Sequence, residues 1–201
     1  YHQNSGAIYV VEHGNHRVVR WLPGSTSPQV VAGGNGAGSG SNQLYGPMDV
    51  FVTPSGSVYV SDYHNARVQR WDPGANSGVT VAGGHGQGSA NHQLYQPIGV
   101  WVDALDRLYV ADYGNNRVVR WNQGASSGDV YRTVESPTDI LFDQNSNFYA
   151  ASNNQHTVFR WAPGSNQAVA AAFARNPHQI AIDGGGDLWV TQHMNNKVSR
   201  H

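Results

Sequence analysis

Residues 108–121 read LYVADYGNNRVVRW, and the chain carries four variants of this phrase: IYVVEHGNHRVVRW from Ile8, VYVSDYHNARVQRW from Val58, FYAASNNQHTVFRW from Phe148 and LWVTQHMNNKVSRH from Leu188. The starts of successive copies are 50, 50, 40 and 40 residues apart. A period of this size is typical of a structural array in which each unit buries its apolar face against the next. The repeat therefore predicts one repetitive domain over residues 1–201.

Each full copy divides into four short strands. An alternating apolar run such as MDVFV begins each copy, and a proline introduces it, as at Pro47, Pro97, Pro137 and Pro177. Proline suits the first residue of a strand because it has no N–H to donate. The Tyr or Trp strand, the RVVRW strand and a short outer strand such as QVVAGG follow, separated by polar and Gly-containing turns. This order predicts an all-β fold, a β-propeller of four-stranded antiparallel blades.

The two ends of the chain carry incomplete blades. The pattern predicts 18 strands: three in the first copy, twelve in the three full copies and three in the last, so about five blades are represented. We expect that the propeller is part of a longer chain, closes imperfectly, or is completed by a neighbouring copy, because an uncovered strand edge is a template for pairing. Contacts between the two dissimilar edges would run head to tail and build a homo-oligomer, polymer or filament.

Composition narrows the classes of partner. Lys and Arg total 12, Asp and Glu total 13, and there is no cysteine. Charges this evenly balanced create no field that would steer the chain to nucleic acid. No apolar stretch approaches the roughly 20 residues of a membrane helix, so membrane insertion is not expected. The absence of cysteine excludes a disulfide framework and cysteine-bound zinc.

Acid and arginine side chains flank the same turn in three copies: Glu12 with Arg17, Asp62 with Arg67, and Asp112 with Arg117. The fourth copy replaces both members together, with Ser152 and Thr157. Loss of one member alone would leave an unpaired charge in a half-buried blade. We therefore interpret these residues as structural ion pairs rather than as independent binding residues.

A tryptophan closes the RVVRW strand in four copies, at Trp21, Trp71, Trp121 and Trp161. An aromatic residue that recurs once per blade predicts packing between neighbouring blades. A platform for stacking sugars is the alternative for these positions.

The phrase YVADYGNNRVVRW, preceded by PxxVxxDxxxxLYV and with AGGxGxGSxxxQLYxP loops between copies, resembles the NHL repeat family. The resemblance covers nearly the whole chain. It implies a β-propeller, commonly six-bladed in that family, with a polar face used for binding. Members of the family include extracellular sensor domains, modules that bind RNA or protein, and an amidating lyase that carries a metal ion.

Histidines gather in the turns and loops that the propeller would place on one face. We take five of them as a candidate polar binding face: His178, His13, His64, His156 and His193. Such a cluster suits a metal site or a pH-responsive surface. Only His178 lies at the mouth of an inner strand, however, where several histidines would have to converge. We therefore expect no bound metal and no cofactor.

Catalytic signatures are missing. The chain has no GxSxG motif, and its glycine-rich loops lead into strands rather than helices. The sequence thus favours a protein that is not an enzyme: a secreted interaction or structural module that binds a protein or glycan on its loop face. A metal-dependent lyase that uses His178 is one alternative, and a ligand-sensing propeller is another.

The segment PGSTSP at residues 23–28 is a Ser/Thr-Pro turn. Such a turn can carry O-linked sugar in an exported protein. The candidate O-glycosylation sites are Ser25, Thr26 and Ser27.

Overall fold

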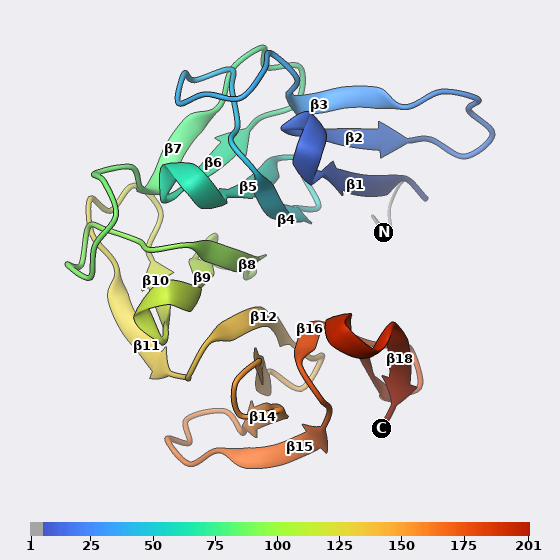
Figure 1. Cartoon of the computed structure of the whole chain (residues 1–201), viewed down its shortest axis with the longest axis vertical. Helices are drawn as coiled ribbons and strands as arrows, with labels where there is room; N and C mark the ends of the chain where they lie inside the picture. Colours follow the sequence, from blue (N-terminus) through green and yellow to red (C-terminus); the bar gives the residue numbers. More distant parts are fainter. Residues whose placement is uncertain (1–5) are drawn as a thin grey trace.

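The computed structural model describes residues 6–201. In this part of the chain, 18 strands form five antiparallel sheets that stand around a common centre (Figure 1). The three middle sheets have four strands each, and the first and last have three. The predictions of an all-β fold and of a β-propeller with two incomplete blades are therefore confirmed.

The three complete blades share one order, from an inner strand at the centre to an outer strand at the rim. The second blade contains β4 (Pro47–Val52), β5 (Val58–Asp62), β6 (Arg67–Trp71) and β7 (Val79–Gly83). The third contains β8 (Pro97–Val102), β9 (Leu108–Asp112), β10 (Arg117–Trp121) and β11 (Asp129–Thr133). The fourth contains β12 (Pro137–Phe142), β13 (Phe148–Ser152), β14 (Thr157–Trp161) and β15 (Val169–Phe173).

The first and last blades each have three strands in the described chain. The first blade contains β1 (Ile8–Glu12), β2 (Arg17–Trp21) and β3 (Gln29–Gly33), and the last contains β16 (Pro177–Ile182), β17 (Leu188–Gln192) and β18 (Lys197–Arg200). In four blades a single turn of 3-10 helix precedes the strand that begins with Arg or Lys (β2, β6, β10 and β18). These turns are η1 (His13–Asn15), η2 (Tyr63–Asn65), η3 (Tyr113–Asn115) and η4 (His193–Asn195).

The tryptophans show how the blades pack. Trp71 and Trp121 are each only 2% exposed, and Trp121 belongs to one apolar cluster with Val68 of the preceding blade and Leu94 of the loop that joins the two blades. Trp21 has no preceding blade in the described chain and is 36% exposed. Packing between blades thus accounts for the recurring tryptophan, and no sugar-stacking role is needed to explain it.

Candidate functional site

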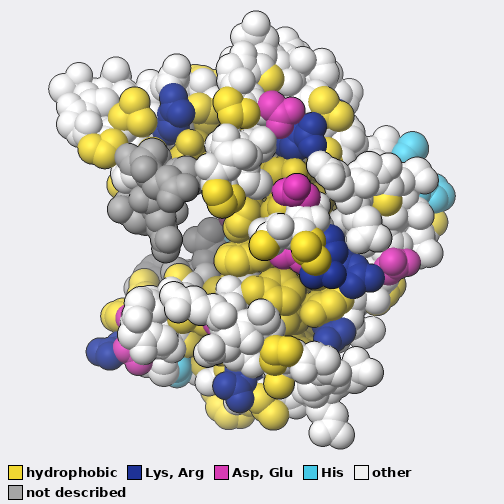
Figure 2. All heavy atoms as spheres, turned by 180° about the vertical axis from the view of Figure 1, so that it is seen from behind, with side chains coloured by type: hydrophobic (Ala, Val, Ile, Leu, Met, Phe, Trp, Pro, Cys, Tyr) yellow, Lys and Arg dark blue, Asp and Glu magenta, His cyan; other side chains and the backbone are white. Residues whose placement is uncertain are grey.

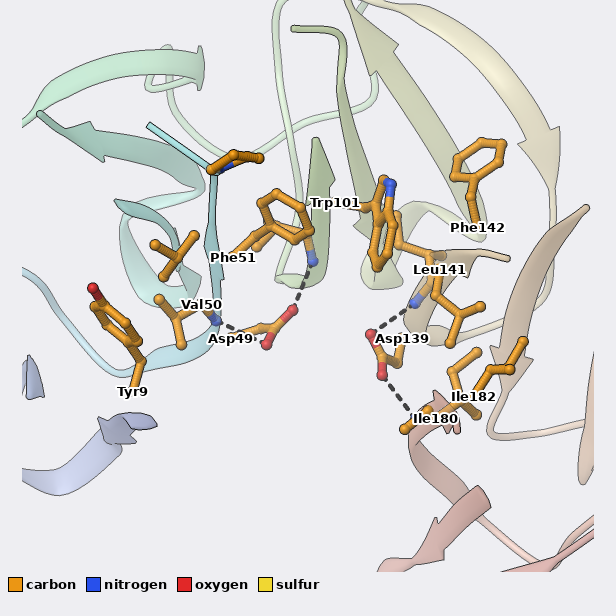
Figure 3. A pocket seen from close by; sticks show the side chains of 15 residues that line it. Tyr9, Asp49, Val50, Phe51, Trp101, Asp139, Leu141, Phe142, Ile180 and Ile182 are labelled. Atoms are coloured by element: carbon orange, nitrogen blue, oxygen red, sulfur yellow. Dashed lines mark hydrogen bonds between the residues drawn. The ribbon is translucent and has the colours of Figure 1, made fainter. Parts of the chain in front are cut away.

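The inner strands β4, β8, β12 and β16 surround a central cavity of about 580 Å³ (Figure 3). Aromatic side chains form much of its wall. The rings of Phe51 and Trp101 lie 4.9 Å apart, and Phe142 follows at 6.4 Å from Trp101. The cavity also has two acidic lining residues, Asp49 and Asp139, and no basic or histidine side chain among its lining residues.

The two aspartates are held by the backbone of two blades at once. Asp49 accepts hydrogen bonds from the N–H of Val50, at 2.8 Å, and from the N–H of Val100 in the next blade, at 2.9 Å. Asp139 repeats this arrangement with Ile140 and Ile180, at 2.8 Å each. The carboxylates come from different blades and lie on either side of the same cavity (Figure 3).

Burial and mutual repulsion perturb both carboxyl groups. Burial raises the pKa of Asp49 above its ordinary value, although the backbone donors act in the opposite direction. Burial also raises the pKa of Asp139, and the nearby charge of Asp49 raises it further. Two carboxylates that share a cavity resist simultaneous ionisation, so the pair favours one proton or one added positive charge.

The third blade has glycine where its neighbours have the acid. A Cβ atom on Gly99 would lie 2.8 Å from the Cα of Asp139, so the backbones approach too closely for a side chain. The sequence motifs did not single out Asp49 and Asp139, because each aspartate stands alone among the apolar residues of an inner strand and belongs to no local catalytic motif. A signal was present: both acids stand at the same position of an otherwise apolar strand.

Two equivalent sets of ion pairs and hydrogen bonds hold the two long loops, residues 34–46 and 84–96. Arg67 donates through Nε to Asp62 at 2.7 Å, and its other nitrogens donate to the backbone oxygens of Ser39, Gly40 and Gln43 at 2.8 to 3.1 Å. Arg117 and Asp112 do the same for the second loop. Each pair therefore has a structural role, because it anchors the long loop that precedes it in the sequence.

The same anchoring role explains why the fourth blade lacks the acid–arginine pair. Its connection from the preceding blade is ten residues shorter, so no loop carbonyls are available to an arginine. Ser152 and Thr157 stand there instead and are buried, with Ser152 donating to the backbone oxygen of Glu135 at 2.5 Å. In the first blade, Glu12 and Arg17 also pair at 2.5 Å but remain partly exposed.

The anchored loops present tyrosines. The second oxygen of Asp62 accepts the backbone N–H of Tyr45, and Asp112 does the same for Tyr95, at 2.7 Å in both cases. The two tyrosines are 45% and 37% exposed. Burial raises the pKa of Tyr63, and the nearby Tyr113 and Tyr95 raise it further, so aromatic side chains of neighbouring blades lie close together.

The five candidate histidines do not form a single cluster. The His64 ring lies 4.5 Å from the Tyr45 ring and 6.3 Å from the His13 ring. His178 and His193 lie 5.5 Å apart and line a second cavity of about 640 Å³ with His13. His156 lies apart and accepts a hydrogen bond from the N–H of Asn176.

The second cavity does not supply a metal site. Burial lowers the pKa of His178, and the neighbouring His193 lowers it further, so a neutral imidazole is available there. Yet among the described residues no three His, Cys, Asp or Glu side chains gather closely enough to hold a metal ion. The metal that the NHL resemblance implies for one family member does not fit this donor set.

The candidate O-glycosylation sites lie outside these cavities and loops. Ser25, Thr26 and Ser27 are exposed in the turn between β2 and β3, where Ser25 donates to the backbone oxygen of Leu22. On the back face, basic and acidic side chains lie beside one another in several places (Figure 2).

No helix within residues 6–201 is long and apolar enough to cross a membrane.

Comparison with known proteins agrees with the fold. Residues 94–121 match the NHL repeat. No curated protein matches the chain. Among solved structures, the chain is similar to a chain of a nidogen–laminin complex, with a TM-score of 0.77 and 14% identity over 98% of this chain and 71% of that one.

Two similar structures are enzymes. A virginiamycin B lyase from Staphylococcus aureus gives a TM-score of 0.65 at 13% identity, and 98% of this chain covers 63% of the lyase. A gluconolactonase from Xanthomonas campestris gives 0.74 at 15% identity, with 92% of this chain covering 65% of that one. The chain thus spans less than two thirds of either enzyme, and at these identities the likeness shows the fold alone.

These structures correct one prediction. The sequence favoured a protein that is not an enzyme, and that prediction is wrong, because the similar propellers include a lyase and a gluconolactonase. The deduction relied on missing linear motifs. A propeller brings side chains together from separate blades, as Asp49 and Asp139 show, so no local motif records its central site.

Proposed function

Since this chain is an NHL-repeat β-propeller, we propose that it binds a small organic cation in its central cavity. The observation that carries this proposal is the lining of the cavity, in which two carboxylates face aromatic walls without a basic partner. A cavity with a few convergent polar groups and perturbed pKa values is the usual form of a small-molecule site.

The chemistry of the lining favours a cation that also has an apolar body. A positive charge between Asp49 and Asp139 would relieve their mutual repulsion and allow both to ionise. The rings of Trp101 and Phe51 line the same cavity, and aromatic rings attract organic cations such as quaternary ammonium groups. A strongly hydrated inorganic ion would gain less from these rings.

Calorimetric titration with two probes of similar shape tests the proposal. Choline carries a positive charge, and 3,3-dimethyl-1-butanol is its uncharged counterpart. We expect choline to bind more tightly, and Trp101→Leu to weaken its binding about two- to fivefold. Trp21→Leu, which changes an indole outside the cavity, is the matched control. Equal affinity for the two probes would contradict the proposal.

A second candidate function is self-association, and the strand edges favour it. In the described chain, β1 is paired with β2 and β18 with β17, each on one side. Ile8 and Val198 on these strands are 53% and 59% exposed. A second copy could continue the hydrogen-bonded ladder from either edge.

A further inference from the structure

The loop face carries a repeated aromatic arrangement that the central cavity does not use. Tyr45 and Tyr95 occupy equivalent positions at the ends of the two long loops, and Tyr63 and Tyr113 occupy equivalent positions at the starts of η2 and η3. The Tyr45 ring contacts His64 at 4.5 Å and His16 at 5.6 Å. We call these four tyrosines, with His16 and His64, the aromatic row.

The aromatic row is rigidly supported. The backbones of Tyr45 and Tyr95 are bonded to Asp62 and Asp112, which are completely buried. The backbone carbonyl oxygens of the same two tyrosines accept hydrogen bonds from the backbone N–H groups of His64 and Gly114, at 3.2 and 2.9 Å. Because the backbone at both tyrosines is already held in place, a ligand that covers them does not have to order the loops first.

The two long loops beside the aromatic row, residues 34–46 and 84–96, are polar and carry no acidic side chain and no lysine or arginine. They are rich in Gly, Ser, Asn and Gln. Their leucines, Leu44 and Leu94, are both 0% exposed, so the loops offer no aliphatic anchor to a protein partner. What the two loops expose is the rings of Tyr45 and Tyr95 and polar side chains such as the amides of Asn42 and Asn91.

We propose that the aromatic row binds a neutral, linear glycan, with sugar rings stacked on Tyr45 and Tyr95 of neighbouring blades. Pyranose rings have apolar C–H faces that pack on aromatic rings, and equatorial hydroxyls that bond to amide side chains. A surface that repeats from one blade to the next suits a ligand that repeats along its length. Neither loop offers a lysine or arginine side chain that would pair with an acidic polysaccharide.

The test measures binding of four uncharged hexasaccharides, namely cellohexaose, chitohexaose, xylohexaose and mannohexaose, to the full chain by calorimetry. We expect at least one to bind, and Tyr45→Ala and Tyr95→Ala each to weaken it about three- to tenfold. Tyr45→Phe and Tyr95→Phe keep the rings and should change the affinity little. Phe173→Ala removes a ring that is 77% exposed on β15, away from the loops, and is the matched control.

Three results would overturn the proposal. One is that no hexasaccharide binds, and another is that the alanine variants bind as tightly as the original chain. The third is that the immobilised chain retains a protein and none of the glycans, which would assign the aromatic row to protein recognition. Choline titration of the same variants separates this site from the central cavity, since Tyr45 and Tyr95 do not line it.

Discussion

The carboxylate of Asp62 shows how much one buried side chain organises. It accepts hydrogen bonds from Arg67, from Asn65 at 2.8 Å and from the backbone of Tyr45. Arg67 in turn places its remaining donors on loop carbonyls. A fully satisfied network of this kind stabilises a loop that is otherwise rich in glycine and polar residues.

Asp62→Ala should therefore destabilise the chain by about 3 kcal/mol, because it leaves the Arg67 guanidinium buried without its counter-ion. Chemical denaturation measures this loss. The double variant with Arg67→Thr should recover part of it, and purely additive losses would refute the coupling. Glu12→Ala is the comparison, since its partly exposed pair with Arg17 should cost less.

Gly114→Ala tests how closely Tyr95 is packed. An added Cβ would lie 2.4 Å from the Cδ1 atom of Tyr95 and 2.8 Å from its backbone oxygen, so the loop must shift. We expect a loss of about 1–3 kcal/mol in unfolding free energy. Gly14 occupies the equivalent position in the first blade, and a Cβ there meets nothing within 4 Å. Gly14→Ala should therefore be neutral, and equal losses at both positions would contradict this explanation.

At the scale of the elements, the inner strands carry a bulge at the position of the two cavity aspartates. The pairing register of β4 with β5 shifts between Pro47 and Val50, and that of β12 with β13 shifts between Pro137 and Asp139. A bulge redirects a side chain without breaking the strand. Here it accompanies an aspartate that bonds to the backbone of the next blade.

This placement predicts how stability depends on pH. The pKa of Asp139 is raised in the folded chain, so the folded state keeps a proton that the unfolded state releases near pH 4. The stability from this group is complete below about pH 4 and is lost as the pH rises through the raised pKa. Denaturant titrations across this range should show the decline, and Asp139→Asn should flatten it. A decline unchanged in that variant would assign the effect to another group.

The tryptophans at the ends of the third strands predict a graded effect. Trp121→Ala should cost about 3–5 kcal/mol, because it empties a site between two blades. Trp21→Ala should cost much less, since that side chain is 36% exposed. Thermal or chemical denaturation of the two variants makes the comparison, and similar losses would contradict packing between blades as the role of Trp121.

The whole molecule is an array whose first and last blades are neighbours on the same side of the ring (Figure 1), where residues of both line one cavity. If self-association uses their edges, multi-angle light scattering should show mass rising with protein concentration. Val198→Lys, a charged change on β18, should shift the distribution toward the monomer, because charged side chains on an edge strand oppose pairing. Lys197→Arg on the same strand is the control. A monomer at every concentration would contradict self-association.

The sequence by itself determined the fold. The spacing of the repeated phrase predicted 18 strands and two incomplete blades, because a short-range repeat of apolar residues, turns and prolines is local information. It also identified the acid–arginine pairs, whose members lie only five residues apart. What each arginine does with its other donors was not readable, since the loop carbonyls come from an earlier part of the chain.

Only the tertiary structure decided where ligands could bind. Asp49 and Asp139 belong to different blades, and their shared cavity exists only when the inner strands surround one centre. The candidate histidines occupy similar places in the repeat, but only the folded chain brings His13 of the first blade to the cavity that His178 and His193 of the last blade also line. His156 has a different partner, the backbone of Asn176. Sequence periodicity specifies the position of a residue within its blade. The distance between residues of different blades depends on how the blades pack around the ring, and that packing is a property of the folded chain.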